Sequence, residues 1–121
     1  MGSKRTLVLG ASPKPDRYAY KAIKMLGQYG HPVVAVGNKE ADVDGVPIVK
    51  SIPFDQPIDT LTMYLSARNQ EQYYDSILQL SPKRVIFNPG AENPVFSNRL
   101  NENGIETEDA CTLVLLSIGA Y

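Results

Sequence analysis

The sequence predicts an α/β fold, in which helices cover both faces of a mainly parallel β-sheet. Three observations favour this fold class. Short apolar runs, typical of strands buried on both faces, recur along the chain. Between these runs lie segments whose apolar residues repeat at helical spacing. Strand and helix alternate from one end of the chain to the other, which favours parallel strands joined by right-handed crossovers.

Length and composition set the class of protein. The 121 residues suggest one domain, residues 1–121, and are enough to bury a core without disulfides. A net charge of −1 argues against a nonspecific nucleic-acid binder. No apolar run approaches the roughly 20 residues of a membrane span, and the N-terminus lacks an apolar signal region. We therefore expect a cytoplasmic protein that has neither nucleic acid nor a membrane as its partner.

The first half of the chain predicts three strands and one helix. Residues 5–10 and 32–37 form the first two strands, and the helix between them ends near Gly30. Residues 38–59 form a long connection, in which 46–49 suggest a short extra strand or a turn. The third strand covers 60–66. The apolar face of the first helix is formed by Ala19, Ala22, Ile23 and Leu26.

The second half continues the alternation. Asn69 and Gln72 resemble a capping box at the start of a helix that follows the third strand. A strand over 84–88, a helix over 95–103 and a strand over 105–108 come next. The last helix covers 109–119, with Asp109 as its N-cap. The whole predicts a single Rossmann-like, three-layer α/β domain with a parallel sheet of about five strands.

In such sheets ligands bind beyond the carboxyl ends of the strands, where the strand order reverses. This rule selects four loops, residues 10–17, 38–40, 66–69 and 88–93. In the first loop, Gly10 permits a sharp turn, while Lys14 and Arg17 bring positive charge to the N-terminus of a helix, a setting that favours phosphate. The alternative is that Gly, Ser and Pro are there only because the turn favours them.

The second loop bears on the kind of nucleotide. An NAD site has an acidic residue near the end of the second strand, but here Asn38 and Lys39 precede the first acid, Glu40. A lysine suits a phosphate on the ribose, which NADP carries at the 2′ position and coenzyme A at the 3′ position. The alternative is a solvated surface lysine.

These residues carry a resemblance to a known family. The stretch "GASPKPDRYAYKAIKML" and the strand end "VGNK" resemble the small stand-alone coenzyme A-binding proteins. Those proteins are similar to the N-terminal domain of the succinyl-CoA synthetase alpha chain. The triplet 109–111, "DAC", matches a late D-x-C element of many members. The proline of the family's N-P-K strand end is absent here, and the loop "NPGAEN" departs from the commoner versions.

The resemblance implies a coenzyme A site. The backbone at the first loop and helix start would hold the pyrophosphate, neutralised by basic side chains and flanked by an aromatic ring. Lys39 would meet the ribose phosphate or the adenine edge, and the third and fourth loops would border the adenosine or the pantetheine arm. The implied contacts are Gly10, Ala11, Ser12, Lys14, Arg17, Tyr18, Asn38, Lys39, Ser66, Arg68, Asn88, Pro89 and Gly90.

We therefore interpret the chain as a coenzyme A or acyl-CoA binding module without evident catalytic residues. The resemblance implies that the synthetase reaction needs a phosphorylated histidine, but the one histidine here, His31, falls at the wrong end of the sheet for that role. The one cysteine, Cys111, is more typical of a packed core residue than of a nucleophile. With one of each, no metal site is expected. Two alternatives stay open, an NADP-dependent oxidoreductase and a regulatory domain that has lost its nucleotide. The apolar last helix could cover the sheet or pair with a second copy in a homodimer.

Overall fold

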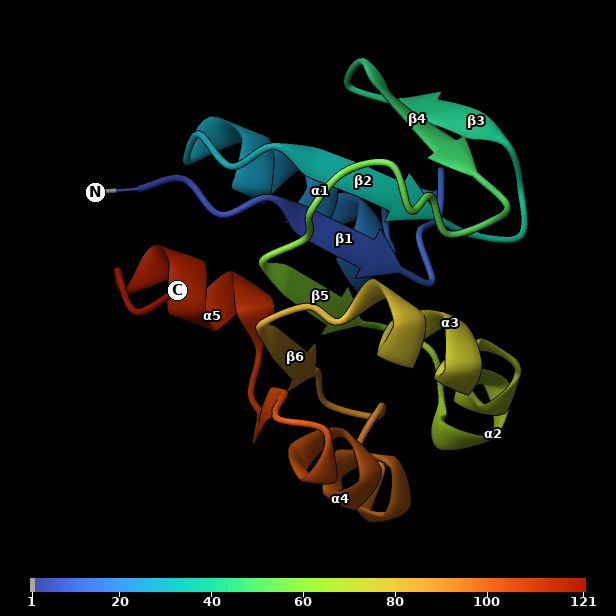
Figure 1. Ribbon diagram of the computed structural model, residues 1–121. Coiled ribbons are helices and arrows are strands. Elements are labelled where there is room, and N and C mark those ends of the chain that lie inside the picture. The colour runs from blue at the N-terminus through green and yellow to red at the C-terminus, as the bar shows by residue number, and fades with distance from the viewer. Residues whose placement is uncertain (1) are drawn as a thin grey trace.

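The computed structural model describes residues 2–121 and confirms a three-layer, Rossmann-like α/β fold (Figure 1). A central sheet carries helices on both of its faces, and strand and helix alternate as the sequence predicts except between residues 33 and 63, where four strands follow one another. The elements are β1 (Thr6–Leu9), α1 (Tyr18–Gln28), β2 (Val33–Val36), β3 (Ala41–Val43), β4 (Val46–Val49), β5 (Thr60–Met63), α2 (Ala67–Gln70), a 3₁₀ turn (Glu71–Tyr73), α3 (Tyr74–Leu80), β6 (Arg84–Phe87), α4 (Pro94–Glu102), β7 (Glu106–Asp109) and α5 (Thr112–Ser117).

The sheet has seven strands in the order β3-β4-β2-β1-β5-β6-β7, which corrects the prediction of about five. The difference is the hairpin β3–β4, which lies at one end of the sheet in Figure 1. Asp44 and Gly45 join its strands with φ angles of 54° and 85°, as a two-residue hairpin turn requires. β4 then pairs parallel to β2, whereas β3 pairs antiparallel to β4 and forms the sheet edge.

Each face of the sheet has its own apolar core, because successive side chains of a strand point to opposite faces. Leu7 and Leu9 of β1 belong to the core that contains Phe96 of α4 and Ile77 of α3. Val8 belongs to the other core, which contains residues of α1 and α5. The core strands Thr6–Leu9 and Thr60–Met63 are buried at every position, as expected of strands covered on both faces.

The helical segment after β5 begins earlier than predicted. Ser66 is the N-cap of α2, so Asn69 lies inside that helix and the capping box predicted for Asn69 and Gln72 is wrong. Instead, the Gln72 side-chain amide donates to the main-chain carbonyl of Asn69 at 3.4 Å. The signal misled because an Asn three residues before a Gln also arises inside a helix.

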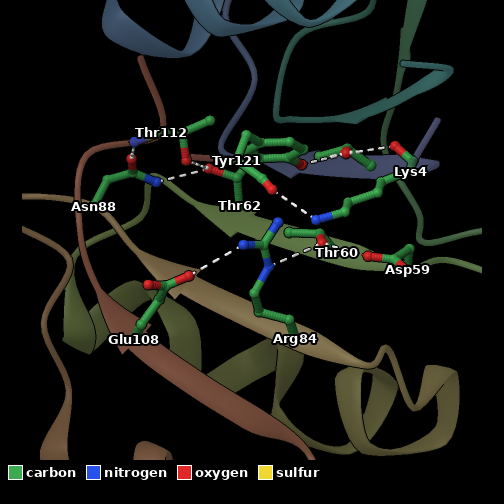
Figure 2. Close-up of polar contacts among 10 residues, drawn as sticks. Lys4, Asp59, Thr60, Thr62, Arg84, Asn88, Glu108, Thr112 and Tyr121 are labelled. Carbon is green, nitrogen blue, oxygen red and sulfur yellow. Dashed lines mark hydrogen bonds and ion pairs between the residues drawn. The ribbon is translucent and has the colours of Figure 1, made fainter. Parts of the chain in front are cut away.

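The start of α5 also differs from the prediction. Asp109 is the last residue of β7, and the helix begins only at Thr112, without a side-chain cap from its own N-cap residue, Cys111. The cap comes from the fourth loop, because the Thr112 N–H donates to Oδ1 of Asn88 at 2.8 Å. Figure 2 shows Asn88 reaching from its loop to both Thr112 and Thr62. A distant side chain therefore fixes where this helix starts.

A polar cluster lies at the amino ends of β1, β5 and β6, opposite the edge formed by the carboxyl ends of these strands (Figure 2). Arg84 pairs with Glu108 at 3.1 Å and donates to Thr60 Oγ1, and its guanidinium lies 4.7 Å from the centre of the Tyr121 ring. The Tyr121 hydroxyl bonds to Thr6, and the Lys4 ammonium donates to the Tyr121 main-chain oxygen at 2.6 Å. These contacts hold the C-terminal segment against the sheet.

His31 belongs to this cluster and makes the stability of the protein depend on pH. Its Nδ1 accepts the Lys4 main-chain N–H at 3.0 Å, and burial, followed by the charges of Lys4 and Arg84, lowers the pKa of His31. The unfolded chain therefore binds a proton more readily than the folded one below about pH 6.5. We expect the free energy of unfolding to be fully retained above that pH and to fall as the pH drops further toward the lowered pKa.

Urea unfolding between about pH 7 and pH 5 measures this loss. His31→Gln is the matched variant, because it removes the titrating group and leaves a neutral acceptor. The variant should lose less stability over that range than the natural chain. Identical pH profiles would show that His31 does not carry the effect.

Candidate functional site

A cleft opens at the carboxyl ends of β1, β2 and β5, the edge of the sheet at which the sequence predicts ligand binding. The chain leaves β1 toward β2 on one side and later reaches β5 on the other, so the strand order reverses here. The cleft has a volume of about 340 Å³. It is lined by Gly10, Ala11, Ser12, Pro13, Lys14, Gly37, Asn38, Lys39, Leu65, Asn69, Gln72 and Tyr73.

The floor of the cleft is a close contact between the first two loops. The N–H groups of Gly10 and Ala11 both donate to the Val36 carbonyl at 2.9 Å. A Cβ added to Gly37 would lie 2.2 Å from the Ala11 carbonyl oxygen, so only glycine fits there. Gly10 has a φ of 93°, in the left-handed region that favours glycine. Because both N–H groups are used inside the protein, a phosphate at this loop has to bind donors that come later in the chain.

Such donors are found at the start of α1, whereas the Lys14 N–H in the loop is used inside the protein as well. Ser12 Oγ accepts the Lys14 N–H at 3.1 Å, which folds the loop back on itself. The helix begins at Tyr18, and its N-cap residue Arg17 gives no side-chain cap. The first N–H groups of any helix lack a partner within it, and they carry the positive end of the helix dipole. The loop therefore ends in a set of donors suited to an anion.

The third wall of the cleft follows β5, and of its residues only Asn69 lies in a loop selected from the sequence, although Asn69 was not among the predicted contacts. Leu65, Asn69, Gln72 and Tyr73 line this wall. Gln70, fully buried, holds it in place: its Nε2 donates to the carbonyls of Leu65 at 2.9 Å and Ala91 at 2.7 Å. Position in the sequence was the available signal for the wall residues, because Leu65 precedes the predicted loop 66–69, and Gln72 and Tyr73 follow it closely.

Gln70 is itself held by the fourth loop. Asn93 Nδ2 donates to Gln70 Oε1 at 2.9 Å and to the Tyr74 hydroxyl at 2.8 Å. The Asn93 carboxamide oxygen meanwhile accepts the Phe96 N–H and so caps α4, whose first residue is Pro94. One buried network thus fixes the cleft wall, the fourth loop and the start of α4 relative to one another.

Six of the predicted contacts meet in the cleft, and they include two exposed lysines from different loops, Lys14 and Lys39. The lysines come from the loops that follow two adjacent strands, so two separate loops bring positive charge to the cleft. Arg17, Ser66, Arg68 and Gly90 are not among its lining residues. The predicted contacts in the cleft are Gly10, Ala11, Ser12, Lys14, Asn38 and Lys39.

A second cavity, of about 200 Å³, takes the remaining three predicted contacts, Tyr18, Asn88 and Pro89. Tyr64, Cys111 and Leu113 complete its lining. The Asn88 side chain is committed within the protein, because it donates to Thr62 Oγ1 and the Met63 carbonyl and accepts from the Thr112 N–H. Cys111 is half-buried in this wall and not part of either core.

Two further findings describe residues 2–121. No three His, Cys, Asp or Glu side chains gather there closely enough to hold a metal ion. None of the helices has the length and apolar character needed to cross a membrane.

Several solved structures have a similar fold. A protein of known crystal structure, described as uncharacterized, is 46% identical over 100% of both chains, with a TM-score of 0.96. A hypothetical protein from Pyrococcus horikoshii OT3 is 24% identical, with a TM-score of 0.84 over 93% of this chain and 80% of the other. The cell-free ID.343 protein from Thermus thermophilus is 24% identical, with a TM-score of 0.85 over 98% and 91%. The last two likenesses show the fold alone.

Comparison of the sequence itself identifies the family. No curated protein matches the chain. The family of the CoA binding domain, however, matches residues 4–117, which include all three loops that form the cleft. By this match over almost its whole length, the chain belongs to the CoA binding domain family.

Proposed function

We propose that the chain binds coenzyme A in the cleft at the ends of β1, β2 and β5. The observation that carries the proposal is that Lys14 and Lys39, from two different loops, line one cleft. Coenzyme A has two phosphate centres, the pyrophosphate and the ribose 3′-phosphate, so it needs two sites of positive charge. Membership of the CoA binding domain family supports coenzyme A over a dinucleotide such as NADP.

Each loop has a part in this proposal. Ser12 and Lys14 contact the pyrophosphate in the cleft through a hydroxyl and a positive charge, and the pyrophosphate faces the first N–H groups of α1, which follow in the chain. Lys39 binds the ribose phosphate through a charge-assisted contact. Tyr73 and Leu65 offer apolar surface to the adenine, and Asn69 and Gln72 offer amides to its edge.

The proposed role is binding without chemistry of its own. Among the residues described, those that line the cleft include no carboxylate, histidine or thiol. These are the side chains that most often act as general bases or nucleophiles. His31 lies in the polar cluster at the opposite edge of the sheet, hydrogen-bonded to the main chain of Lys4.

Calorimetry with coenzyme A, dephospho-coenzyme A and NADP tests the proposal. Coenzyme A should bind at one site per chain and more tightly than the other two. Tighter binding of NADP would favour an oxidoreductase instead. If none of the three ligands gives measurable heat, the result would contradict the proposal and favour a regulatory domain that has lost its nucleotide.

We expect Lys39→Ala to weaken coenzyme A by about tenfold or more, because a contact of this kind contributes roughly 1.5–3 kcal/mol. Dephospho-coenzyme A, which lacks the ribose phosphate, should lose little affinity in the same variant. Lys14→Ala is the matched control: it should weaken both ligands alike, since both keep the pyrophosphate. Equal losses in Lys39→Ala would show that the ribose phosphate lies elsewhere.

A further inference from the structure

The second cavity adjoins the cleft. Tyr64 and Leu65 are consecutive residues, yet Tyr64 lines the cavity and Leu65 lines the cleft. Gly10 lies at the junction, because a Cβ added to it would sit 3.2 Å from both the Tyr64 carbonyl carbon and the Leu65 side chain. In coenzyme A the pantetheine arm joins the pyrophosphate to the thiol, so an arm that folds back over the junction at Gly10 would bring the acyl end to this cavity.

The cavity offers little to a polar ligand group. Both donors and the acceptor of the Asn88 side chain are used inside the protein. The Tyr64 hydroxyl is buried, and burial raises the pKa of Tyr64 to about 12, so the phenol is neutral. Within the described chain, the lining residues carry no charge, and Pro89 and Leu113 add apolar surface. The walls thus favour an apolar group, in contrast to the two lysines of the cleft.

We propose that this cavity receives the acyl chain of a short-chain acyl-coenzyme A, so that the preferred ligand is the thioester and not free coenzyme A. The inference rests on the proposed function, which places the nucleotide end in the cleft. Its size sets the chain length: an apolar cavity of about 150 Å³ holds a benzene molecule. A volume of about 200 Å³ therefore suits an acyl chain of roughly four to six carbons.

A series of ligands tests the inference by calorimetry on the natural chain. Each buried methylene should raise affinity about fourfold, so butyryl-coenzyme A, which has two more methylenes, should bind about fifteenfold more tightly than acetyl-coenzyme A. Dodecanoyl-coenzyme A should gain nothing further, because its chain exceeds the cavity. Equal affinity for coenzyme A and all its thioesters would overturn the inference and leave the proposed function standing. Failure of every ligand to bind would overturn both.

Two neighbouring positions on α5 give a matched pair of variants. Leu113 lines the cavity, whereas Val114 is 52% exposed and is not part of the lining. Leu113→Trp should fill the cavity and reduce butyryl-coenzyme A to the affinity of free coenzyme A, while free coenzyme A binds as before. Val114→Trp should leave both affinities unchanged. Unaltered preference for the butyryl thioester in Leu113→Trp would contradict the placement of the acyl chain.

Cys111 provides a readout that needs no variant. Cys111 is the one cysteine of the sequence and lines the cavity. Alkylation of its thiol by iodoacetamide therefore reports access to the cavity. Butyryl-coenzyme A at saturation should slow alkylation several-fold more than saturating desulfo-coenzyme A does, which lacks a thiol that would consume the reagent. Equal protection by the two ligands would show that the acyl chain lies outside the cavity.

Discussion

Gly37→Ala should destabilise the fold by about 3 kcal/mol and abolish coenzyme A binding. The added Cβ would lie 2.2 Å from the carbonyl oxygen of Ala11, which is a main-chain atom and cannot rotate away. Relief requires the first loop to move off the end of β2. That movement would break the bonds from Gly10 and Ala11 to the Val36 carbonyl and separate the two lysine-bearing walls of the cleft.

Gly27→Ala is the matched control, because it makes the same chemical change in the exposed part of α1. A Cβ there would meet nothing within 4 Å. Alanine in a helix is favoured over glycine, so this variant should gain about 0.5–1 kcal/mol and keep its ligand affinity. Urea unfolding and calorimetry on both variants check the pair. Natural stability and affinity in Gly37→Ala would refute the described contact between the loops.

Asn88→Ala should cost about 2–3 kcal/mol of folding free energy. The side chain is 2% exposed and makes three hydrogen bonds, two as donor and one as acceptor. Its loss leaves the Thr112 N–H at the start of α5 without its acceptor. Thr62 keeps its bond to Thr112, and the Met63 carbonyl keeps the Asn88 main-chain N–H, so the cost is centred on the helix start.

An exposed asparagine gives the comparison. Asn103 donates to the Arg99 carbonyl at the surface, and Asn103→Ala should change stability by no more than about 0.5 kcal/mol. Thermal or urea unfolding measures both variants, and amide hydrogen exchange along α5 locates the effect. A loss in Asn88→Ala no larger than that in Asn103→Ala would mean that the buried network adds nothing to stability.

The alternation of apolar runs was enough to predict the layers and the main strands. The hairpin β3–β4 was missed as a pair because the apolar signal in its strands is weak, although Asp44-Gly45 is the usual dipeptide of a two-residue turn. The start of α5 was predicted wrongly for another reason. The cap of α5 comes from Asn88 in the fourth loop, and a partner far away in sequence leaves no local pattern.

The site was predicted in part for the same physical reason. Parallel strands have their carboxyl ends at one edge of the sheet, so the loops that carry Lys14 and Lys39 both lie at that edge, independently of how the helix between the two strands packs. Sequence position did not reveal that the Gly10 and Ala11 N–H groups are used by Val36, nor that Gln70 is buried and holds the third wall. Both depend on contacts between loops, which only the folded chain displays.

Titration of the isotope-labelled protein with coenzyme A, followed by two-dimensional NMR, tests the central claim most directly, because it reports both binding and its place. The account predicts saturable shifts of the amide signals of Ser12, Lys39 and Asn69, which come from the three loops of the cleft. The signal of Arg84, in the polar cluster at the amino end of β6, should stay in place. Shifts confined to residues outside the cleft, or no shifts at millimolar coenzyme A, would contradict it.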